Sequence, residues 1–389
     1  MELKQGYKNT EVGKIPINWD IDLLENLTKV IDPHPSHRAP KSVDKGIPFL
    51  GIGDLNENGQ IIKEKFRRVD EQIFEEHKLR YDLRKDLIGL GRVASIGKVI
   101  KLKNNIGKYT LSPTLGVLDS IGINKGYLYY ILNSEYIKSY FSKIMSGSTR
   151  SSVGMIVLRK IPVPLPPLPE QKAIAQVLSD TDNLIQAIER KLAKKRAIKQ
   201  GAMQQLLTPK EDWEVKKLGD FLVYEQPTDY IVTDTEYNDN YDIPVLTAGK
   251  TFILGYTNEK FGVFKDAPVI IFDDFTTATK FVDFHFKVKS SAMKILKKKN
   301  DSVDIRFIYE LMQQIVFPLG DHKRHWIGEY QHIEIKVPKP KEQLEIATIL
   351  SDMDAEIAQI EQKLSKYKML KQGLMQNLLT GKIRLVCVE

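Results

Sequence analysis

The sequence lacks the features that would place a protein outside the cytoplasm. Its single cysteine, Cys387, excludes a disulfide bond within the chain. No apolar run approaches the roughly 18 residues that a membrane-spanning helix needs. The first residues, Met1 to Gln5, have no apolar core of the kind found in signal peptides. We therefore expect a cytoplasmic protein with no membrane partner.

The sequence also has little that would support cofactor chemistry. Gly89, Gly91 and Ala94 fit a loose dinucleotide-binding pattern. Gly97 and a strand-like stretch follow where that motif needs a helix, so we predict a hairpin turn here. No Asn/Asp-Pro-Pro-aromatic motif is present to hold a flipped base for amino methylation. We expect no cofactor in this chain.

Candidate metal and catalytic clusters are equally sparse. The dense histidine group at 322–325 has no further ligands at the spacings that zinc requires. Asp273 and Asp274 could suggest a nuclease carboxylate pair, but no Glu-x-Lys follows at a suitable distance, which favours a turn after a strand. The sequence therefore predicts no metal site and no catalytic residue, and the chain is not expected to be an enzyme.

Positive charge is present in excess and is unevenly distributed. Residues 1–169 contain 26 basic and 18 acidic residues, whereas residues 209–341 contain 19 basic and 21 acidic residues. The basic first half favours a polyanionic partner such as nucleic acid. Solubility alone would also account for such a charge.

The strongest feature of the sequence is an internal duplication. Residues 170–208 align without a gap with residues 342–380, and 22 of the 39 pairs are identical. In each copy apolar residues recur at steps of four and three, a period typical of a left-handed coiled coil. These positions are Ile174, Leu178, Ile185, Ile188 and Leu192, with Thr181 in one place, and Ile346, Leu350, Met353, Ile357, Ile360 and Leu364. We expect the two helices to pair within the chain, where each is always present at high effective concentration.

The segments before the two repeats resemble each other only faintly. Trp19 and Leu24 match Trp213 and Leu218, but most of the rest has diverged. Short β-like runs at 86–92 and 267–273, and amphipathic patterns at 127–141 and 305–317, predict a mixture of strands and helices. We predict an α/β (α+β) fold class, with two strand-rich globules joined by two long helices that form an intramolecular antiparallel coiled coil. The expected boundaries are 1–160, 161–208, 209–335 and 336–380, with a tail at 381–389.

The repeat and its flanks resemble a known family. The proline-rich segment 161–169, the following Glu170 and Gln171, and a helix ending in Lys-Gln-Gly at 199–201 and Leu-Leu-Thr at 206–208 are similar to one region of type I restriction-modification specificity subunits. In that family, this region joins a target-recognition domain to a conserved helix. The second copy departs from the usual Leu-Pro-Pro run but keeps Glu342 and Gln343. The resemblance covers nearly the whole chain.

The resemblance implies a function in DNA recognition. It implies that two target-recognition domains lie at opposite ends of the helical pair. Each reads half of a bipartite, asymmetric target in double-stranded DNA, with an unread spacer between the halves. Two methylation subunits, which bind S-adenosylmethionine and methylate adenine N6, dock on such a subunit, and translocating restriction subunits can join them. The chemistry then belongs to other chains.

We predict DNA contacts in four polar loops, because base edges and phosphates are read by basic and polar side chains. In the first globule the candidates are Arg92, Ser95 and Lys98 in a glycine-rich turn, and Ser148, Thr149 and Arg150 in a polar loop. In the second globule they are Thr276, Thr277 and Lys280 after a strand, and His322, Lys323, Arg324 and His325. A solvated surface loop is the alternative for each group.

Two other interpretations are compatible with the sequence. One is the specificity subunit of a type IIB-like enzyme, which would act by the same mechanism. The other is a coiled-coil adaptor protein that binds no DNA. Salt-dependent DNA binding in the presence of the methylation partner would separate the adaptor from the other two.

Overall fold

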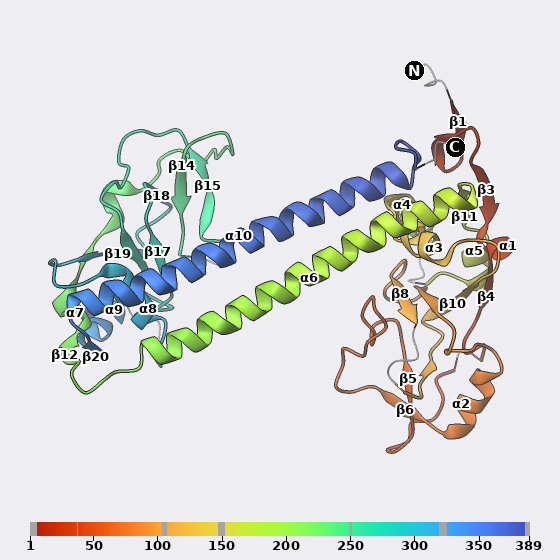
Figure 1. Cartoon of the computed structure of the whole chain (residues 1–389), viewed down its shortest axis with the longest axis horizontal. Helices are drawn as coiled ribbons and strands as arrows, with labels where there is room; N and C mark the ends of the chain where they lie inside the picture. Colours follow the sequence, from red (N-terminus) through yellow and green to blue (C-terminus); the bar gives the residue numbers. More distant parts are fainter. Residues whose placement is uncertain are drawn as a thin grey trace. The chain divides into compact units, whose positions relative to one another are not determined.

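Figure 1 shows a computed structural model of the chain, which describes residues 6–36, 38–102, 107–146, 152–248, 251–318 and 325–385. The chain forms two compact units, residues 1–189 with 363–389, and residues 190–362. Each unit contains one strand-rich head and a section of both long helices. No helix within the described ranges is long and apolar enough to cross a membrane.

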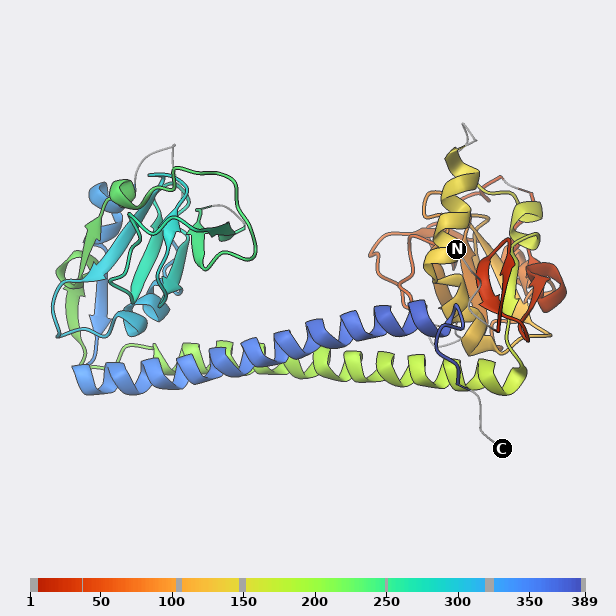
Figure 2. The same cartoon turned by 90° about the horizontal axis from the view of Figure 1, so that it is seen from above.

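Both repeat copies form long helices, as predicted. Helix α6 (Leu168–Leu206) and helix α10 (Pro340–Leu378) have 39 residues each. Strand β11 (Pro162–Leu165) precedes α6, and the prolines between them end the strand and begin the helix, where a missing N–H costs nothing. Most of the predicted apolar stripe is buried, including Ile174, Leu178 and Leu350. Figure 2 shows the two helices side by side within each unit.

Ion pairs fix the direction of helix pairing in each unit. Residue numbers rise along α6 as they fall along α10, so the two helices are antiparallel. The pairs are Asp182–Lys371 at 2.6 Å and Glu189–Lys368 at 2.7 Å in the first unit, and Asp354–Lys199 at 2.7 Å and Glu361–Arg196 at 2.5 Å in the second. The pairs of the second unit join the residues that align in the repeat with those of the first. The acidic partners lie on α6 in the first unit and on α10 in the second.

The two heads share one topology despite their diverged sequences. The main sheet of the first head has the order β4-β10-β7-β8, and that of the second has the order β13-β19-β16-β17, with every pairing antiparallel. These strands are Thr28–Ile31, Leu115–Ser120, Leu87–Gly91 and Val99–Leu102, and Leu222–Glu225, Met293–Lys298, Val269–Asp273 and Thr279–Val282. The duplication therefore includes the heads.

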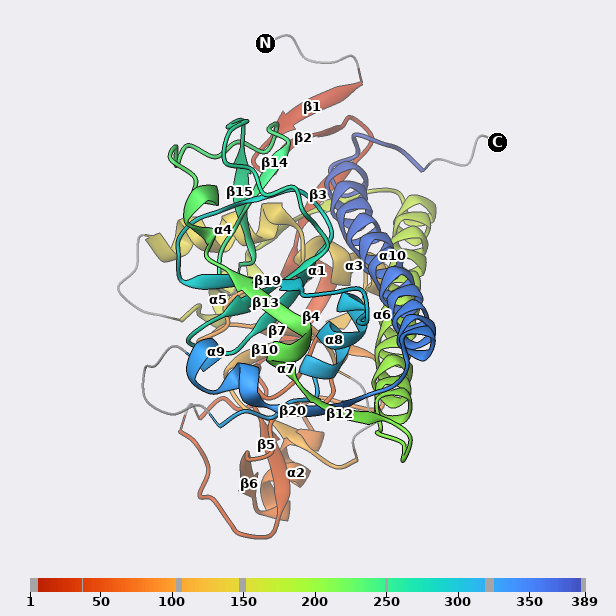
Figure 3. The same cartoon turned by 90° about the vertical axis from the view of Figure 1, so that its left-hand side faces the viewer.

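Smaller sheets repeat as well. A three-stranded sheet has the order β6-β5-β9 (Arg67–Val69, Ile47–Leu50, Thr110–Leu111) in the first head and β15-β14-β18 (Ile253–Thr257, Ile243–Leu246, Lys287–Val288) in the second. Strand β3 (Asp20–Leu23) pairs with β11, and β12 (Glu214–Lys217) pairs with β20 (Glu334–Val337), as Figure 3 shows for the second pair. The first head also has a hairpin of β1 (Tyr7–Thr10) and β2 (Gly13–Pro16).

Some predicted boundaries differ from the observed ones. The helix expected at 127–141 is two helices, α3 (Lys125–Leu132) and α4 (Glu135–Ser146), and the one expected at 305–317 is α8 (Ile305–Met312). The break follows from Asn133, whose side chain donates to the Tyr129 carbonyl at the end of α3. The boundary expected at residue 161 falls just before β11, which belongs to the first head because it pairs with β3.

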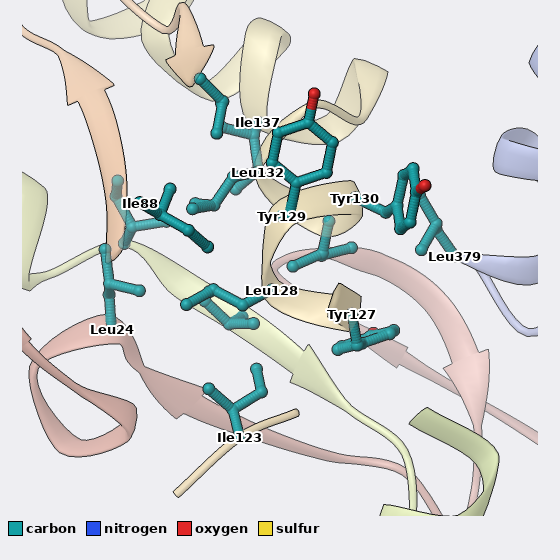
Figure 4. Packing of buried hydrophobic residues seen from close by; sticks show 14 of the residues in the cluster. Leu24, Ile88, Ile123, Tyr127, Leu128, Tyr129, Tyr130, Leu132, Ile137 and Leu379 are labelled. Carbon is teal, nitrogen blue, oxygen red and sulfur yellow. The ribbon is translucent and has the colours of Figure 1, made fainter. Parts of the chain in front are cut away.

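Short helices complete each head. The first head contains α1 (Leu24–Leu27), α2 (Glu71–Lys78) and α5 (Met155–Arg159). The second contains α7 (Leu218–Phe221), α9 (His325–Gly328) and the 3₁₀ turns η1 (Pro227–Tyr230) and η2 (Tyr330–His332). In the first unit, α3 packs Tyr127 and Leu128 into a core that also contains Leu378, the last residue of α10, and Leu379 directly after it (Figure 4). The long helices therefore supply part of the core of the head.

A buried glutamine fastens each head to its helix. The side chain of Gln171 donates to the Pro166 carbonyl at 2.8 Å and accepts from the backbone N–H of Asn124 at 2.8 Å. Gln343 makes the same two bonds, at 2.8 Å to Pro338 and at 2.9 Å from Asp304. Asn124 and Asp304 are the N-caps of α3 and α8. Both hydrogen-bonding ends of the glutamine side chain are therefore used in the same way in the two units.

The glutamate before Gln171 holds the C-terminal tail in the first unit. Arg384 donates two hydrogen bonds, of 2.7 and 2.8 Å, to the carboxylate of Glu170, which also accepts from the Trp19 indole at 3.1 Å. Tyr7 donates to the Gly381 carbonyl at 2.8 Å. In the second unit Glu342 pairs with Lys210 at 2.6 Å, and the buried Trp213 indole nitrogen has no hydrogen-bond partner among the described residues. This part of the duplication has become asymmetric.

The substitution Arg384→Ala should therefore have a pH-dependent cost. Burial alone would raise the pKa of Glu170, but the bonds from Arg384 and Trp19 outweigh it and lower the pKa. A lowered folded-state pKa contributes stability above the ordinary carboxyl pKa of 4.5, and that stability is lost as the pH falls through the folded value. We expect a loss of about 2 kcal/mol at neutral pH that shrinks below pH 4.5. Urea unfolding from pH 3 to 8 measures it. Lys382→Ala, at an exposed tail position, is the control, and a loss independent of pH would contradict the account.

Candidate nucleic-acid interface

The predicted turn after strand β7 and its counterpart after β16 are hairpin loops of related geometry. In the first head the N–H of Gly97 donates to the Gly91 carbonyl at 3.0 Å, and in the second the N–H of Thr277 donates to the Asp273 carbonyl at 2.9 Å. Gly97 and Thr277 both have left-handed backbone, with φ of 79° and 58°. Thr277 therefore adopts a conformation that β-branched residues rarely occupy.

In the first hairpin the predicted cations are used inside the head. Arg92 is buried, donates to the Val153 carbonyl at 3.1 Å and pairs with Asp32 at 3.2 Å. The Lys98 ammonium donates to the carbonyls of Ile52 and Leu55 at 3.0 and 2.6 Å. In this structure both side chains position loops, and their role in DNA contact stays a prediction. Ser95 is half-buried and lines a surface hollow of about 520 Å³.

In the second hairpin the predicted residues are more accessible. The Asp273 carboxylate accepts from the Phe275 N–H at 2.9 Å and from the Thr276 hydroxyl at 2.7 Å, which closes the turn. Asp273 is therefore the last residue of strand β16, and its carboxylate closes the turn that follows, which begins at Asp274. Thr276 and Lys280 are exposed, Thr277 is half-buried, and the side chain of Lys280 has no partner among the described residues. Thr276, Lys280 and Phe275 line a hollow of about 570 Å³.

The other two predicted loops are only partly described. Ser148, Thr149 and Arg150, and His322, Lys323 and Arg324, lie outside the described residues. The residues that follow each group dock in the same way. The N–H of Val153 donates to the Arg92 carbonyl at 2.8 Å, and the N–H of His325 donates to the Asp274 carbonyl at 3.0 Å. Val153 and His325, which follow the two groups in the sequence, therefore lie at equivalent points of the two heads.

His325 does not lie on the surface. Its side chain is buried, and its ring contacts Phe317 edge-on at a centroid distance of 5.3 Å. A buried ring with these neighbours anchors the end of the loop, and it is not accessible to a DNA base in this structure. We therefore assign His325 a positioning role.

The structure reveals a buried polar network in the first head that the sequence did not indicate. His34 and His77 share a hydrogen bond of 2.9 Å, His77 also bonds Thr110 of β9, and Tyr81 bonds Thr110 at 2.9 Å. Burial and the nearby His34 and Arg80 lower the pKa of His77 to about 4, so this imidazole is neutral at pH 7. The network holds the segment after β4 against the small sheet.

The second head has a different network at the equivalent strand position. Lys287 of β18, which corresponds to Thr110 by strand register, pairs with Glu259 at 2.6 Å. Glu259 also accepts from the N–H and hydroxyl of Thr233, at 3.0 and 2.6 Å. Burial alone would raise the pKa of Glu259, but the bonds from Lys287, Thr233 and Asp234 lower it to about 2. The equivalent loops of the two heads are therefore held in place by different side-chain interactions.

These networks join residues that are far apart in sequence, as Lys287 and Glu259 are, so no local spacing could have indicated them.

The sequence did contain a further signal for a polyanion-binding surface, namely the basic residues that follow His34. Arg38, Lys41 and Lys45 are exposed in the first head. No cluster of three or more metal-ligating side chains occurs among the described residues. The exposed polar loops are suited to binding a polyanion, since phosphate contacts come from such cations.

Comparisons with known proteins agree with this geometry. A family model for the type I restriction modification DNA specificity domain matches residues 19–197 and again residues 210–367. The type I restriction enzyme EcoR124I/EcoR124II specificity subunit of Escherichia coli is 47% identical over 163 residues, which are 39% of this chain and 40% of that protein. The putative type I restriction enzyme MjaX specificity subunit of Methanocaldococcus jannaschii is 26% identical over 98% of this chain and 97% of its own length.

A solved structure shares the fold. The S subunit of a type I restriction-modification system from M. genitalium superposes with a TM-score of 0.67 at 14% identity, over 97% of this chain and 98% of that one. The two matches of the family model each begin at a head and extend into the long helix that follows it. Because they account for most of the sequence, the chain belongs to the family of type I restriction-modification DNA specificity subunits.

Proposed function

We propose that this chain selects the DNA target of a type I restriction-modification complex, with each head reading one half of a bipartite, asymmetric site. The observation that carries the proposal is a contrast between the two duplicated parts of the chain, the long helices and the heads. The helices keep the same ion pairs and the same glutamine contacts, while the heads keep one topology but differ in their loops. A common frame with two unlike reading surfaces fits a target with two unlike halves.

The proposal places the chemistry in other chains. Two methylation subunits would bind S-adenosylmethionine and methylate adenine, and restriction subunits would join the complex to translocate and cut DNA. This chain would contribute affinity and sequence choice, and it would work in the cytoplasm, where the DNA is. The exposed cations of the heads, Lys280 among them, would supply phosphate contacts that position the loops over the bases.

Exchange of one head tests the proposal. Residues 20–165, from β3 to β11, would be replaced with the matching head of a related subunit, which leaves Trp19 and Glu170 in place. We expect one half of the methylated motif to change while the other half is retained, because the second head is untouched. Methylome sequencing of cells that express the chain with a methylation subunit gives the result.

The reciprocal exchange of residues 214–337, from β12 to β20, is the matched control and should change the other half. If either exchange changed both halves, or neither, recognition would not be divided between the heads. Absence of any salt-dependent DNA binding in the assembled complex would favour the adaptor interpretation instead.

Removal of one exposed cation tests the second hairpin. Lys280→Ala should weaken DNA binding about equally across target sequences and reduce the slope of log affinity against log salt by about 1, because one phosphate contact is lost. Lys336→Ala, at an exposed position of β20, serves as the comparison and should leave the slope unchanged. Fluorescence anisotropy titrations of the assembled complex at several salt concentrations measure both. Equal slopes for Lys280→Ala and the wild type would remove Lys280 from the interface.

A further inference from the structure

The two hairpins differ in what fills the space beside them. Lys98 and Ala278 occupy equivalent positions, because each carbonyl accepts a 2.8 Å hydrogen bond from the N–H of the last residue of β7 or β16. In the first head the Lys98 ammonium donates to the carbonyl of Ile52, two residues after β5. The equivalent residue of the second head, two residues after β14, is Ala248. Two alanines therefore stand where the first head has a lysine and an isoleucine, and a hollow of about 570 Å³ lies open beside them.

The side chains that line this hollow are mostly apolar. We call it the alanine hollow, and among its lining residues are Ala248, Phe252, Phe275, Thr276, Ala278 and Ala292. Phe275 is 43% exposed, and Ala278 is exposed as well. The Asp273 carboxylate fixes the turn, since it accepts from the Phe275 N–H at 2.9 Å and from the Thr276 hydroxyl at 2.7 Å. The second hairpin thus presents an aromatic ring and small apolar groups on a turn closed by hydrogen bonds.

The polar side chains that read other bases are absent from this hairpin or are used inside the head. Residues 273–280 include no arginine, asparagine or glutamine, which read guanine and adenine in the major groove. Carboxylates read cytosine, but that of Asp273 closes the turn. That of Asp274 is buried and accepts from the Trp326 N–H at 2.9 Å. With Lys280 assigned to a phosphate, apolar contact with the 5-methyl group of thymine remains as the mode of base readout.

We propose that the second head recognises an A·T base pair by receiving the 5-methyl group of its thymine in the alanine hollow, with Phe275 as the specificity-determining contact. The inference rests on the proposed function and adds the identity of one base pair in the half-site of the second head. Alanine, phenylalanine and the methyl group of threonine are the groups that contact this methyl group in the major groove. Lys280 also lines the hollow, so its phosphate contact holds the DNA backbone beside it. The first head has no such contact at the equivalent position, because Lys98 is there.

Removal of the methyl group from the DNA tests the proposal without changing the protein. The full chain, assembled with its methylation subunits, would be titrated with a duplex that carries its own motif, as read by methylome sequencing. Each thymine in the half-site of the second head would be replaced in turn by deoxyuridine, which lacks only the 5-methyl group. At one position we expect binding to be about fourfold weaker, which is the effect of burying one methyl group. A half-site with no thymine on either strand, or equal binding of every deoxyuridine duplex, overturns the inference.

Three variants locate the contact on the protein. In Phe275→Ala, and in Ala278→Lys, which introduces the lysine of the first head, the preference for thymine over deoxyuridine should disappear. Phe284→Ala is the matched control and should keep the preference, because Phe284 is 37% exposed on the same head and is not among the residues that line the hollow. All three positions are exposed, so the melting temperatures should stay close to that of the wild type. Retention of the preference in Phe275→Ala, or its loss in Phe284→Ala, contradicts the assignment.

Failure of this inference is distinguishable from failure of the proposed function. If exchange of one head changes one half of the motif but deoxyuridine has no effect in the second half-site, the thymine contact alone is wrong. If exchange of one head changes both halves or neither, the division of recognition between the heads is wrong.

Discussion

Asp182 of α6 pairs with Lys371 of α10, and the equivalent Asp354 of α10 pairs with Lys199 of α6. These reciprocal ion pairs fix the antiparallel register of the two helices within each unit. Partly exposed ion pairs contribute only about 0–1 kcal/mol each, whereas full burial of a leucine or isoleucine side chain contributes about 1.5–3 kcal/mol. The buried stripe, which includes Ile185 and Ile188 on α6 and Ile360 on α10, therefore contributes more to the stability of the helix pair than the ion pairs do. The ion pairs select one alignment among those that the stripe permits.

On this frame the heads vary without changing how they are held. The bonds of Gln171 and Gln343 are the same in the two units, and the main sheets have the same strand order. The buried interactions differ at an equivalent strand position. Thr110 hydrogen-bonds His77 in the first head, whereas Lys287 forms an ion pair with Glu259 in the second. The structure thus separates a support that is the same in both units from interactions that differ between the heads.

The sequence predicted what depends on short-range periodicity. Helices α6 and α10, their pairing and the turns after β7 and β16 follow from local spacing and from the repeat. The shared head topology was not predicted, because strand order depends on pairings across long separations that diverged sequences conceal. Individual site residues were also hard to place, since a basic side chain such as Arg92 can pair with Asp32 inside the head as readily as with a phosphate. The sequence marked Lys280 and His325 equally as polar loop candidates, but Lys280 is exposed and His325 is buried.

The reciprocal register of the helices is the central claim, and thermal unfolding of charge-reversed variants tests it most directly. Asp182→Lys places two lysines together and should lower the melting temperature of the chain. Adding Lys371→Asp should restore the part of the loss that comes from the ion pair, because it rebuilds the pair in reverse, while the hydrogen bond from Tyr130 to Asp182 stays lost. Adding Lys199→Asp instead should lower the melting temperature further, because that residue faces Asp354. Equal effects of the two second substitutions would contradict the register.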